Sequence, residues 1–161
     1  MPAGLPLAPE SEEGRMALAM EEARRGAEAN EVPVGAILVG PGGELLAVAH
    51  DERMALADPT AHAEVLAMRR AAQLLGDWRL DGCDLYVTLE PCPMCAGALV
   101  LARVRRVVYG ATSPKSGAVE TLTRLLDVEV FNHRVEAQGG LKAEECGGIL
   151  SAYFQSRRNK I

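Results

Sequence analysis

Two short stretches, His62-Ala63-Glu64 and Pro91-Cys92-Pro93-Met94-Cys95, place the strongest constraint on how this chain can fold. They carry an imidazole, a carboxylate and two thiols. An imidazole and two thiols suit Zn²⁺, and three protein ligands leave a fourth position open, which is typical of catalytic zinc sites. We therefore expect the fold to bring both stretches to one metal site, with His62, Cys92 and Cys95 as ligands.

Two further cysteines, Cys83 and Cys146, could compete to complete a closed structural zinc site. Cys83 lies at the far end of a predicted strand from Cys92, roughly 20 Å away by strand rise. Cys146 lies on the apolar stripe of the last predicted helix. We expect both to pack as small hydrophobic side chains rather than to bind metal or to form a disulfide framework.

The composition is that of one globular domain, with 161 residues of which 48% are apolar. We predict a flexible leader over residues 1–10 and a single domain over 11–161. No apolar run approaches the ~20 residues that span a bilayer, and the N-terminus lacks the basic start and apolar run of a signal peptide. We therefore expect a cytoplasmic protein without a membrane partner. The net charge of −5 gives no whole-chain signal for nucleic acid, so a polyanionic partner would need a local basic patch.

Apolar periodicity and capping residues divide the domain into helices and strands. Ser11 caps the first helix, Pro41-Gly42-Gly43 marks a hairpin turn, and Gly76 ends the second helix. The predicted helices cover residues 11–29, 61–75, 93–102, 119–126 and 142–158. The predicted strands cover residues 33–39, 45–49, 84–89, 105–109 and 127–130, and residues 51–58 and 110–117 are loops. This order predicts an α/β domain with a mixed central sheet and helices on both faces.

Both motifs fall at the starts of predicted helices, where α/β proteins build their sites. A helix N-terminus presents free N–H groups and partial positive charge, which favour ionised carboxylates and lower thiol pKa values. Cys95 follows Cys92 by three residues, so both sulfurs can converge on one ion. Glu64, beside the ligand His62, can accept a proton from a water that zinc acidifies and pass it to the substrate. This is the chemistry of hydrolytic deamination.

The two motifs match the signature of the zinc-dependent nucleobase deaminases. Over about residues 16–158 the chain is similar to the bacterial tRNA-specific adenosine deaminase family (TadA). The resemblance is carried by Glu31-Val32-Pro33-Val34-Gly35-Ala36, Asp58-Pro59-Thr60-Ala61-His62-Ala63-Glu64, Thr88-Leu89-Glu90-Pro91-Cys92, Met94-Cys95-Ala96-Gly97-Ala98 and Asn132-His133-Arg134-Val135-Glu136. It implies a three-layer cytidine deaminase-like fold with a mixed five-stranded sheet, and a homodimer. It also implies conversion of adenosine to inosine at the wobble position of a tRNA anticodon.

The resemblance implies a role for each matching residue. His62, Cys92 and Cys95 match the ligands of one zinc ion per subunit, and Glu64 matches the catalytic proton shuttle. The residues expected around the flipped base and the anticodon stem-loop are Val34, Asp51, Ala63, Leu89, Glu90, Lys115, Tyr153, Phe154, Arg157 and Arg158. Aromatic stacking together with phosphate contacts is the usual way in which proteins hold single-stranded RNA.

Two departures from the family pattern leave other functions open. Asp51 stands where the family has an asparagine that contacts the target nucleoside, and an ionised carboxylate can only accept hydrogen bonds. Thr112-Ser113-Pro114-Lys115 replaces a loop that usually carries an aspartate before the lysine. The alternative is a deaminase of a free base or nucleoside, of the guanine or cytosine type. A third possibility is a non-catalytic, zinc-stabilised module that binds RNA or another partner.

Overall fold

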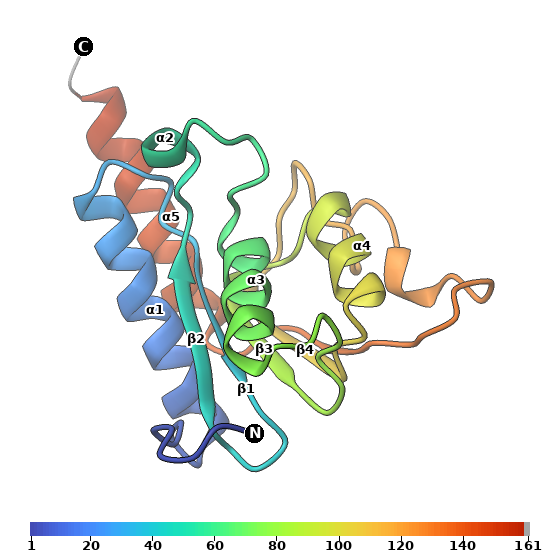
Figure 1. Ribbon diagram of the computed structural model, residues 1–161. Coiled ribbons are helices and arrows are strands. Elements are labelled where there is room, and N and C mark those ends of the chain that lie inside the picture. The colour runs from blue at the N-terminus through green and yellow to red at the C-terminus, as the bar shows by residue number, and fades with distance from the viewer. Residues whose placement is uncertain (160–161) are drawn as a thin grey trace.

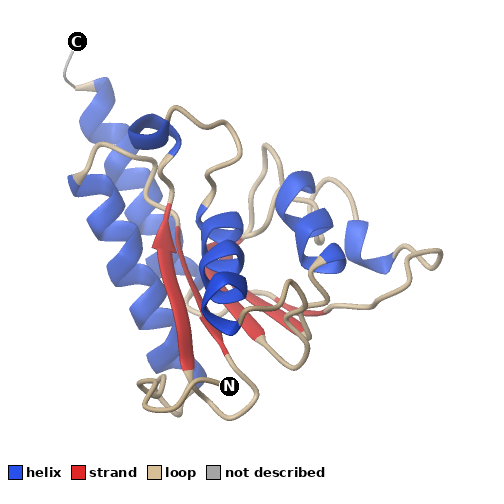
Figure 2. Cartoon of the chain, viewed as in Figure 1, coloured by secondary structure: helices blue, strands red, loops and turns tan. Residues whose placement is uncertain are grey.

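A five-stranded mixed sheet lies at the centre of the domain, as predicted (Figures 1 and 2). The computed structural model describes residues 1–159. The strands are β1 (Gly35–Val39), β2 (Leu45–His50), β3 (Asp84–Leu89), β4 (Arg106–Ala111) and β5 (Glu136–Gln138), in the spatial order β2-β1-β3-β4-β5. β1 pairs antiparallel with β2 and β3, whereas β3, β4 and β5 run parallel. The sheet therefore has an antiparallel half and a parallel half that meet at β3.

Helices cover both faces of the sheet and complete three layers (Figure 1). One face is covered by α1 (Glu12–Glu28) and α5 (Ala143–Arg158), and the other by α3 (Ala63–Leu75) and α4 (Pro93–Leu101). Along β1, Leu38 packs in the cluster that includes α3 and α4, whereas Ile37 packs in the cluster that includes α1. Because adjacent strand residues point to opposite faces, the apolar strands serve both cores. No helix within residues 1–159 is long and apolar enough to cross a membrane.

The predicted capping residues set the start of α1 and the end of α3. The hydroxyl of Ser11 accepts the N–H of Gly14 at 3.0 Å and begins α1. Pro93 occupies the first turn of α4, and Gly76 ends α3 in the left-handed conformation with a φ of 70°. The predicted limits of α1, α4, α5 and of the first four strands are confirmed to within two residues.

The start of α3 is corrected by the structure. The helix begins at Ala63 rather than at residue 61, and His62 is its extended N-cap residue with φ −74° and ψ 152°. The reason lies in Asp58, whose carboxylate accepts the N–H and the hydroxyl of Thr60 and holds the preceding segment in a turn. The predicted loop 51–58 also contains a short helix, α2 (Arg53–Leu56), which sequence periodicity did not indicate.

The predictions for residues 119–130 were wrong. Residues 119–126 form turns and only a short 3₁₀ helix, η1 (Leu125–Asp127), and residues 127–130 are not a strand. The fifth strand is β5 instead, three exposed residues that pair with β4 through their backbone. Along the last helix, only Cys146 of the predicted buried stripe is fully buried. Its C-terminal half extends past the sheet, which leaves Phe154 46% exposed (Figure 1).

The segment that we predicted as a flexible leader contacts the β1–β2 hairpin. The N–H of Leu45 donates to the carbonyl of Pro6, the N–H of Ala8 donates to the carbonyl of Gly43, and Ala8 is buried. The division into a leader over residues 1–10 and one domain over 11–161 stays a prediction.

Replacing Gly35 with alanine is expected to destabilise the fold by about 3 kcal/mol. A Cβ at Gly35 would lie 1.9 Å from the carbonyl oxygen of Ala19 and 2.5 Å from the nitrogen of Ala23, so α1 could not approach β1. Thermal unfolding should show a melting temperature lower by about 6–12 °C. The matched control is Gly148→Ala on α5, where a Cβ would meet nothing within 4 Å. Equal melting temperatures for the two variants would contradict this packing.

Candidate active site

One edge of the sheet collects the segments that carry the predicted site residues. Gly35 at the start of β1 pairs with His50 at the end of β2, and Leu89 at the end of β3 pairs with Ala111 at the end of β4. The residues just outside these ends therefore lie at the same edge, as expected for a site in an α/β protein. The N-termini of α3 and α4 lie close to this edge (Figure 1).

His62, Cys92 and Cys95 converge at the starts of these two helices. Nδ1 of His62 lies 3.5 Å from Sγ of Cys92 and 3.4 Å from Sγ of Cys95. For tetrahedral zinc with ordinary Zn–N and Zn–S bonds, a nitrogen and a sulfur ligand are separated by about 3.6 Å. The observed separations fit that geometry. Within residues 1–159 these three form the only group whose ligand atoms could hold a metal ion.

The two thiols of this cluster have opposite pKa shifts. Hydrogen bonds from Cys95 and then His62, against the opposing effect of burial, lower the pKa of Cys92 to about 4. The pKa of Cys95 is raised, first by its bond to Cys92 and then by burial. Cys92 is therefore a thiolate near neutral pH, whereas Cys95 is a thiol that would lose its proton when a metal ion binds. Burial raises the pKa of Cys83 and of Cys146 to about 11, and both pack in the core as predicted.

A cavity of about 140 Å³ opens beside the metal ligands. A cavity of this size can hold a single aromatic ring. Four of the predicted base-contacting residues line it, namely Val34, Asp51, Leu89 and Glu90, together with His62, Glu64 and Cys92. Val32, Arg53 and Ser116 also line it. Sequence reasoning did not assign these three to the site: Val32 lies in a stretch that carries the resemblance, and Arg53 and Ser116 belong to no motif. We call this space the catalytic cavity.

Glu64 is the buried acid of the catalytic cavity, with only 4% of its surface exposed. Burial, and next the negative charge of Asp51, raise the pKa of Glu64 to about 7. A cation bound by the neighbouring ligands would act in the opposite direction and favour the carboxylate. Near neutral pH this side chain can therefore both accept and donate a proton, which is the requirement for a general acid–base residue.

Asp51 links the wall of the cavity to the start of α3. One of its carboxylate oxygens accepts the N–H of Ala63 at 2.9 Å, and the other lies 3.2 Å from Nη2 of Arg53. Burial raises the pKa of Asp51 against the opposing effects of these two contacts. Ala63 thus contributes its backbone to the site through Asp51.

The carboxylate of Glu90 holds the loop that follows β4. It accepts the backbone N–H groups of Ser113, Val119, Glu120 and Thr121 at 2.8–3.1 Å. Although burial opposes ionisation, these hydrogen bonds lower the pKa of Glu90 to about 2. Farther along this segment, the N–H groups of Leu122 and Thr123 donate to the carbonyl of Gly117, so residues 119–126 form turns in place of the predicted helix. Glu90 therefore fixes the segment that carries Lys115 and Ser116 beside the cavity.

Replacing Glu90 with glutamine is expected to destabilise the protein by about 2–3 kcal/mol, because an amide donor would face backbone N–H donors. Denaturant unfolding measures the change. The Glu90 carboxylate makes its full contribution to the free energy of unfolding above its unfolded-state pKa of about 4.3. This contribution is lost as pH falls toward its folded-state pKa of about 2. The deficit of the variant should therefore shrink from pH 6 to pH 3. Glu136→Gln on exposed β5 is the matched control. A stability difference between the wild type and Glu90→Gln that stays constant between pH 6 and pH 3 would contradict the low pKa of Glu90.

The predicted RNA-contacting residues lie around the mouth of the cavity. Lys115, Phe154, Arg157 and Arg158 line one surface hollow, which we call the tail hollow. The mouth hollow is lined by Asn30, Glu31, Val32, Arg53, Met54, Tyr153 and Arg157. Val32 and Arg53 line both the mouth hollow and the catalytic cavity, so the two spaces adjoin. The guanidinium of Arg157 stacks over the ring of Tyr153, 4.6 Å from its centroid.

The layered α/β fold with this cavity defines the class of protein, a deaminase. Residues 10–158 match the family described as MafB19-like deaminase. The chain is 53% identical to the tRNA-specific adenosine deaminase of Bacillus subtilis (strain 168), over 88% of each chain. The chain therefore belongs to the MafB19-like deaminase family and, within it, to the tRNA-specific adenosine deaminases.

Solved structures agree with this placement. A structure from a study of A-to-I editing by tRNA deaminases at the wobble position of transfer RNA superimposes with a TM-score of 0.81. It is 46% identical and covers 84% of this chain and 98% of its own. The guanine deaminase of Bacillus subtilis superimposes with a TM-score of 0.60 at 30% identity, covering 92% and 94%. The predicted fold and family are confirmed.

Proposed function

We propose that this chain catalyses hydrolytic deamination of adenosine to inosine at the wobble position of a tRNA anticodon. The observation that carries the proposal is the 53% identity with a tRNA-specific adenosine deaminase over 88% of both chains. The catalytic cavity supports it, because apolar side chains and a few polar groups line it together with two of the metal ligands. A cytoplasmic location, where tRNA is available, is part of the proposal.

One Zn²⁺ per subunit would be held by Nδ1 of His62 and by the sulfurs of Cys92 and Cys95. Their mutual distances suit this ion, and the donor set of one imidazole and two thiolates is one that it prefers. When bound, zinc acidifies the attacking water.

Glu64 carries the proton transfers of the reaction. Its carboxylate accepts one proton from the attacking water and delivers it to the ring nitrogen beside the carbon that bears the amino group. The second proton of that water leaves with the amino group as ammonia, so one water and one adenosine give one inosine and one ammonia. Val32, Val34 and Leu89 form the apolar walls that hold the base and limit access of bulk water.

The RNA would enter from the side of α5. Tyr153 and Phe154 offer aromatic surfaces, and Lys115, Arg157 and Arg158 offer positive charge for phosphates. This local patch resolves the apparent conflict between an acidic chain and a polyanionic substrate, because binding depends on the charge near the site rather than on the total.

A homodimer is also part of the proposal. Large apolar side chains are exposed on α4 and on the segments before and after η1, namely Met94, Leu101, Leu122, Val130 and Phe131. Exposed apolar groups of this kind are typical of interaction surfaces. Light scattering coupled to size exclusion should give twice the chain mass, and a monomer at micromolar concentration would contradict this part of the proposal.

The deciding experiment is incubation of the zinc-loaded chain with an anticodon stem-loop that carries adenosine at the wobble position. Inosine should form at that position and at no other adenosine, with one ammonia released per inosine. The matched control is the same stem-loop with cytidine at the wobble position. Failure of the zinc-loaded protein to form inosine would overturn the proposal.

The second candidate is deamination of a free guanine-type base. The observation that favours it is the carboxylate of Asp51 in the wall of the cavity, because it can accept hydrogen bonds from amino groups of a small substrate. Ammonia release from free guanine, with every stem-loop inert, would select this function over the first.

A further inference from the structure

Of the arginine and lysine side chains that the structure describes, nine form ion pairs with carboxylates. Arg15, Arg69 and Arg134 do not, and neither do four that lie near α5. Arg25, Arg53, Arg70, Arg79, Arg103, Arg105, Arg106, Arg124 and Lys142 all form ion pairs. Among the residues that the structure describes, no carboxylate oxygen lies within 4.0 Å of the charged groups of Arg24, Lys115, Arg157 or Arg158. Lys115, Arg157 and Arg158 line the tail hollow, and Arg24 lies in a separate groove that Arg157 also lines.

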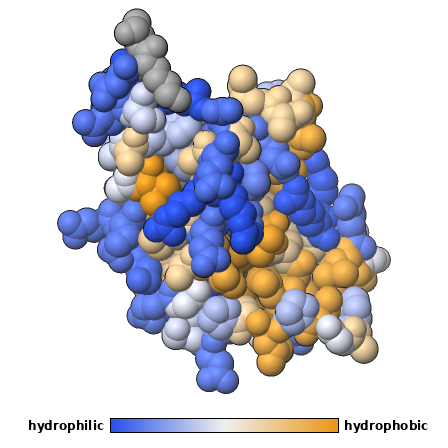
Figure 3. All heavy atoms as spheres, turned by 90° about the vertical axis from the view of Figure 1, so that its left-hand side faces the viewer, coloured by the Kyte–Doolittle hydropathy of each residue, from blue (hydrophilic) through white to orange (hydrophobic). Residues whose placement is uncertain are grey.

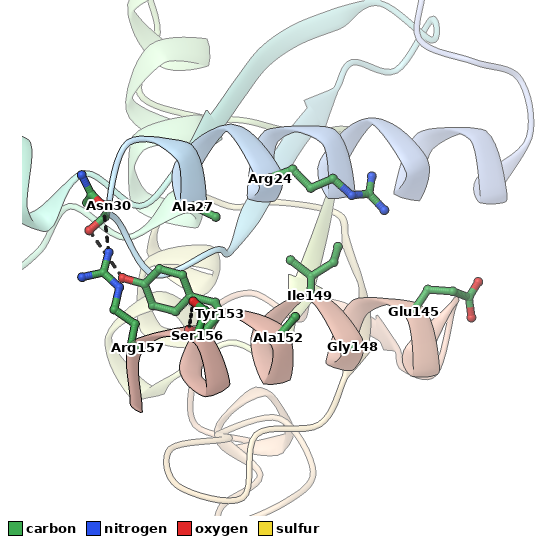
Figure 4. A pocket seen from close by; sticks show the side chains of 10 residues that line it. All are labelled: Arg24, Ala27, Asn30, Glu145, Gly148, Ile149, Ala152, Tyr153, Ser156 and Arg157. Atoms are coloured by element: carbon green, nitrogen blue, oxygen red, sulfur yellow. Dashed lines mark hydrogen bonds between the residues drawn. The ribbon is translucent and has the colours of Figure 1, made fainter. Parts of the chain in front are cut away.

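This second space, the α1–α5 groove, has a volume of about 550 Å³ (Figure 4). It is lined by Arg24, Ala27, Asn30, Glu145, Gly148, Ile149, Ala152, Tyr153, Ser156 and Arg157. Figure 4 shows Arg24 on α1 extending along the groove, and Arg157 at the opposite end beside Asn30 and Tyr153. Small residues on α5 leave the middle open. Figure 3 views the side of the molecule that carries α1 and α5, where long hydrophilic side chains gather.

The groove continues the path that leads out of the catalytic cavity. The cavity shares Val32 and Arg53 with the mouth hollow, and the mouth hollow shares Asn30, Tyr153 and Arg157 with the groove. Arg157 stands at the junction. Nη2 of Arg157 donates to Oδ1 of Asn30 at 3.1 Å, and its guanidinium is stacked on Tyr153. The junction is therefore ordered by side-chain contacts, with guanidinium N–H groups left to bind a ligand.

The charges along this path favour an anionic, extended ligand. The groove and the two hollows together are lined by four cations without an ion pair among the described residues, Arg24, Lys115, Arg157 and Arg158, and by Arg53, which pairs with Asp51. The acidic residues that line them are Glu31 and Glu145. Both carboxylate oxygens of Glu31 accept backbone N–H groups of α2, and Glu145 pairs with Lys142 at 3.6 Å. The positive charge is therefore the more available of the two.

We propose that the α1–α5 groove binds the ribose-phosphate backbone of the RNA that flanks the target nucleotide, with Arg24 and Arg157 contacting its phosphates. The inference rests on the proposed function, because the occupant is the same RNA whose base enters the catalytic cavity. Arginine suits phosphate geometry, the hydroxyl of Ser156 and the amide of Asn30 supply further polar contacts, and the small side chains of Ala27, Gly148 and Ala152 admit a backbone. The groove would thereby extend RNA recognition beyond the anticodon loop.

The test is the affinity of the zinc-loaded Arg24→Ala protein for a full-length tRNA with wobble adenosine, measured by fluorescence anisotropy over a range of salt concentrations. We expect the Kd to rise about fivefold, and the slope of log K against log salt to fall in magnitude by about 1, because one phosphate contact is lost. The weaker binding should raise both Kd and KM. Arg79→Ala, an exposed arginine paired with Asp77 in the loop after α3, is the matched control.

A second variant tests tRNA binding in the α1–α5 groove independently of Arg24. Ala152→Glu places a carboxylate on an exposed helical position in the groove and should weaken tRNA binding more than Arg24→Ala does. Wild-type affinity and salt slope in both variants would overturn the inference, even if the wild-type protein forms inosine. Absence of inosine and of tRNA binding in the wild-type protein would instead overturn the proposed function.

Discussion

Replacing Glu64 with glutamine is expected to lower kcat by about 10²- to 10⁴-fold and to leave the metal content unchanged. The amide keeps the shape of the buried side chain but can neither accept nor return a proton. Glu64 is not one of the three converging ligands, so zinc binding should survive. Single-turnover formation of inosine in a stem-loop, with metal content measured on the same preparation, gives both quantities.

Two further observations separate a catalytic from a structural effect of this change. Burial and the charge of Asp51 raise the pKa of Glu64 to about 7, and a bound cation would lower it because it favours the carboxylate. The wild-type kcat/KM should therefore rise with pH along a limb at or below pH 7, and this limb should be absent in the variant. Glu136→Gln, on the exposed edge strand, is the matched control. Activity above one tenth of wild type would contradict the role of Glu64.

The sequence was most informative where local signals and chemistry coincided. His62, Cys92 and Cys95 lie beside helix starts, and the caps at Ser11 and Gly76 require only near neighbours. Such signals operate over a few residues, so a reading of the chain alone can recover them. The same holds for β3, in which three consecutive apolar residues, Leu85, Tyr86 and Val87, are buried on both faces.

Elements fixed by distant contacts were the ones that the sequence did not predict. The turns at 119–121 exist because Glu90, about thirty residues earlier, takes their N–H groups. The short helix α2 depends on Glu31, whose carboxylate accepts the N–H groups of Met54 and Ala55. β5 has three exposed residues and no apolar alternation, so only its pairing with β4 identifies it. In all three cases the local sequence carries no signal for the partner.

Residues on the surface around the catalytic cavity were likewise not predicted where distant contacts bring them together. The resemblance drew attention to Tyr153 and Arg157 on α5, but Asn30, in the turn after α1, and Arg53, the first residue of α2, belong to no motif. They join the site because α1 ends, and α2 begins, next to the C-terminal half of α5 (Figure 1). Substrate contacts therefore depend on packing between helices, whereas the chemistry depends on short motifs.

Replacing Cys95 with alanine is expected to abolish stoichiometric zinc binding and inosine formation. Cys95 is fully buried at the start of α4, and its sulfur lies 3.4 Å from Nδ1 of His62. Within residues 1–159 no other His, Cys, Asp or Glu side chain belongs to this ligand group. Because zinc binds the folded chain, its loss also lowers stability. At a free zinc concentration 1,000 times the dissociation constant, the wild-type protein gains about 4 kcal/mol. Metal analysis and thermal unfolding with and without added zinc measure both effects.

Chelation gives the matching experiment on the unaltered chain. Removing zinc from the wild-type protein should lower its melting temperature to near that of Cys95→Ala, and added zinc should restore it only in the wild type. Cys83→Ala is the matched control, because Cys83 is equally buried but lies outside the ligand cluster. This control should lose packing energy yet keep one zinc per chain. A zinc-dependent rise in the melting temperature of Cys95→Ala would show that the cluster is not the metal site.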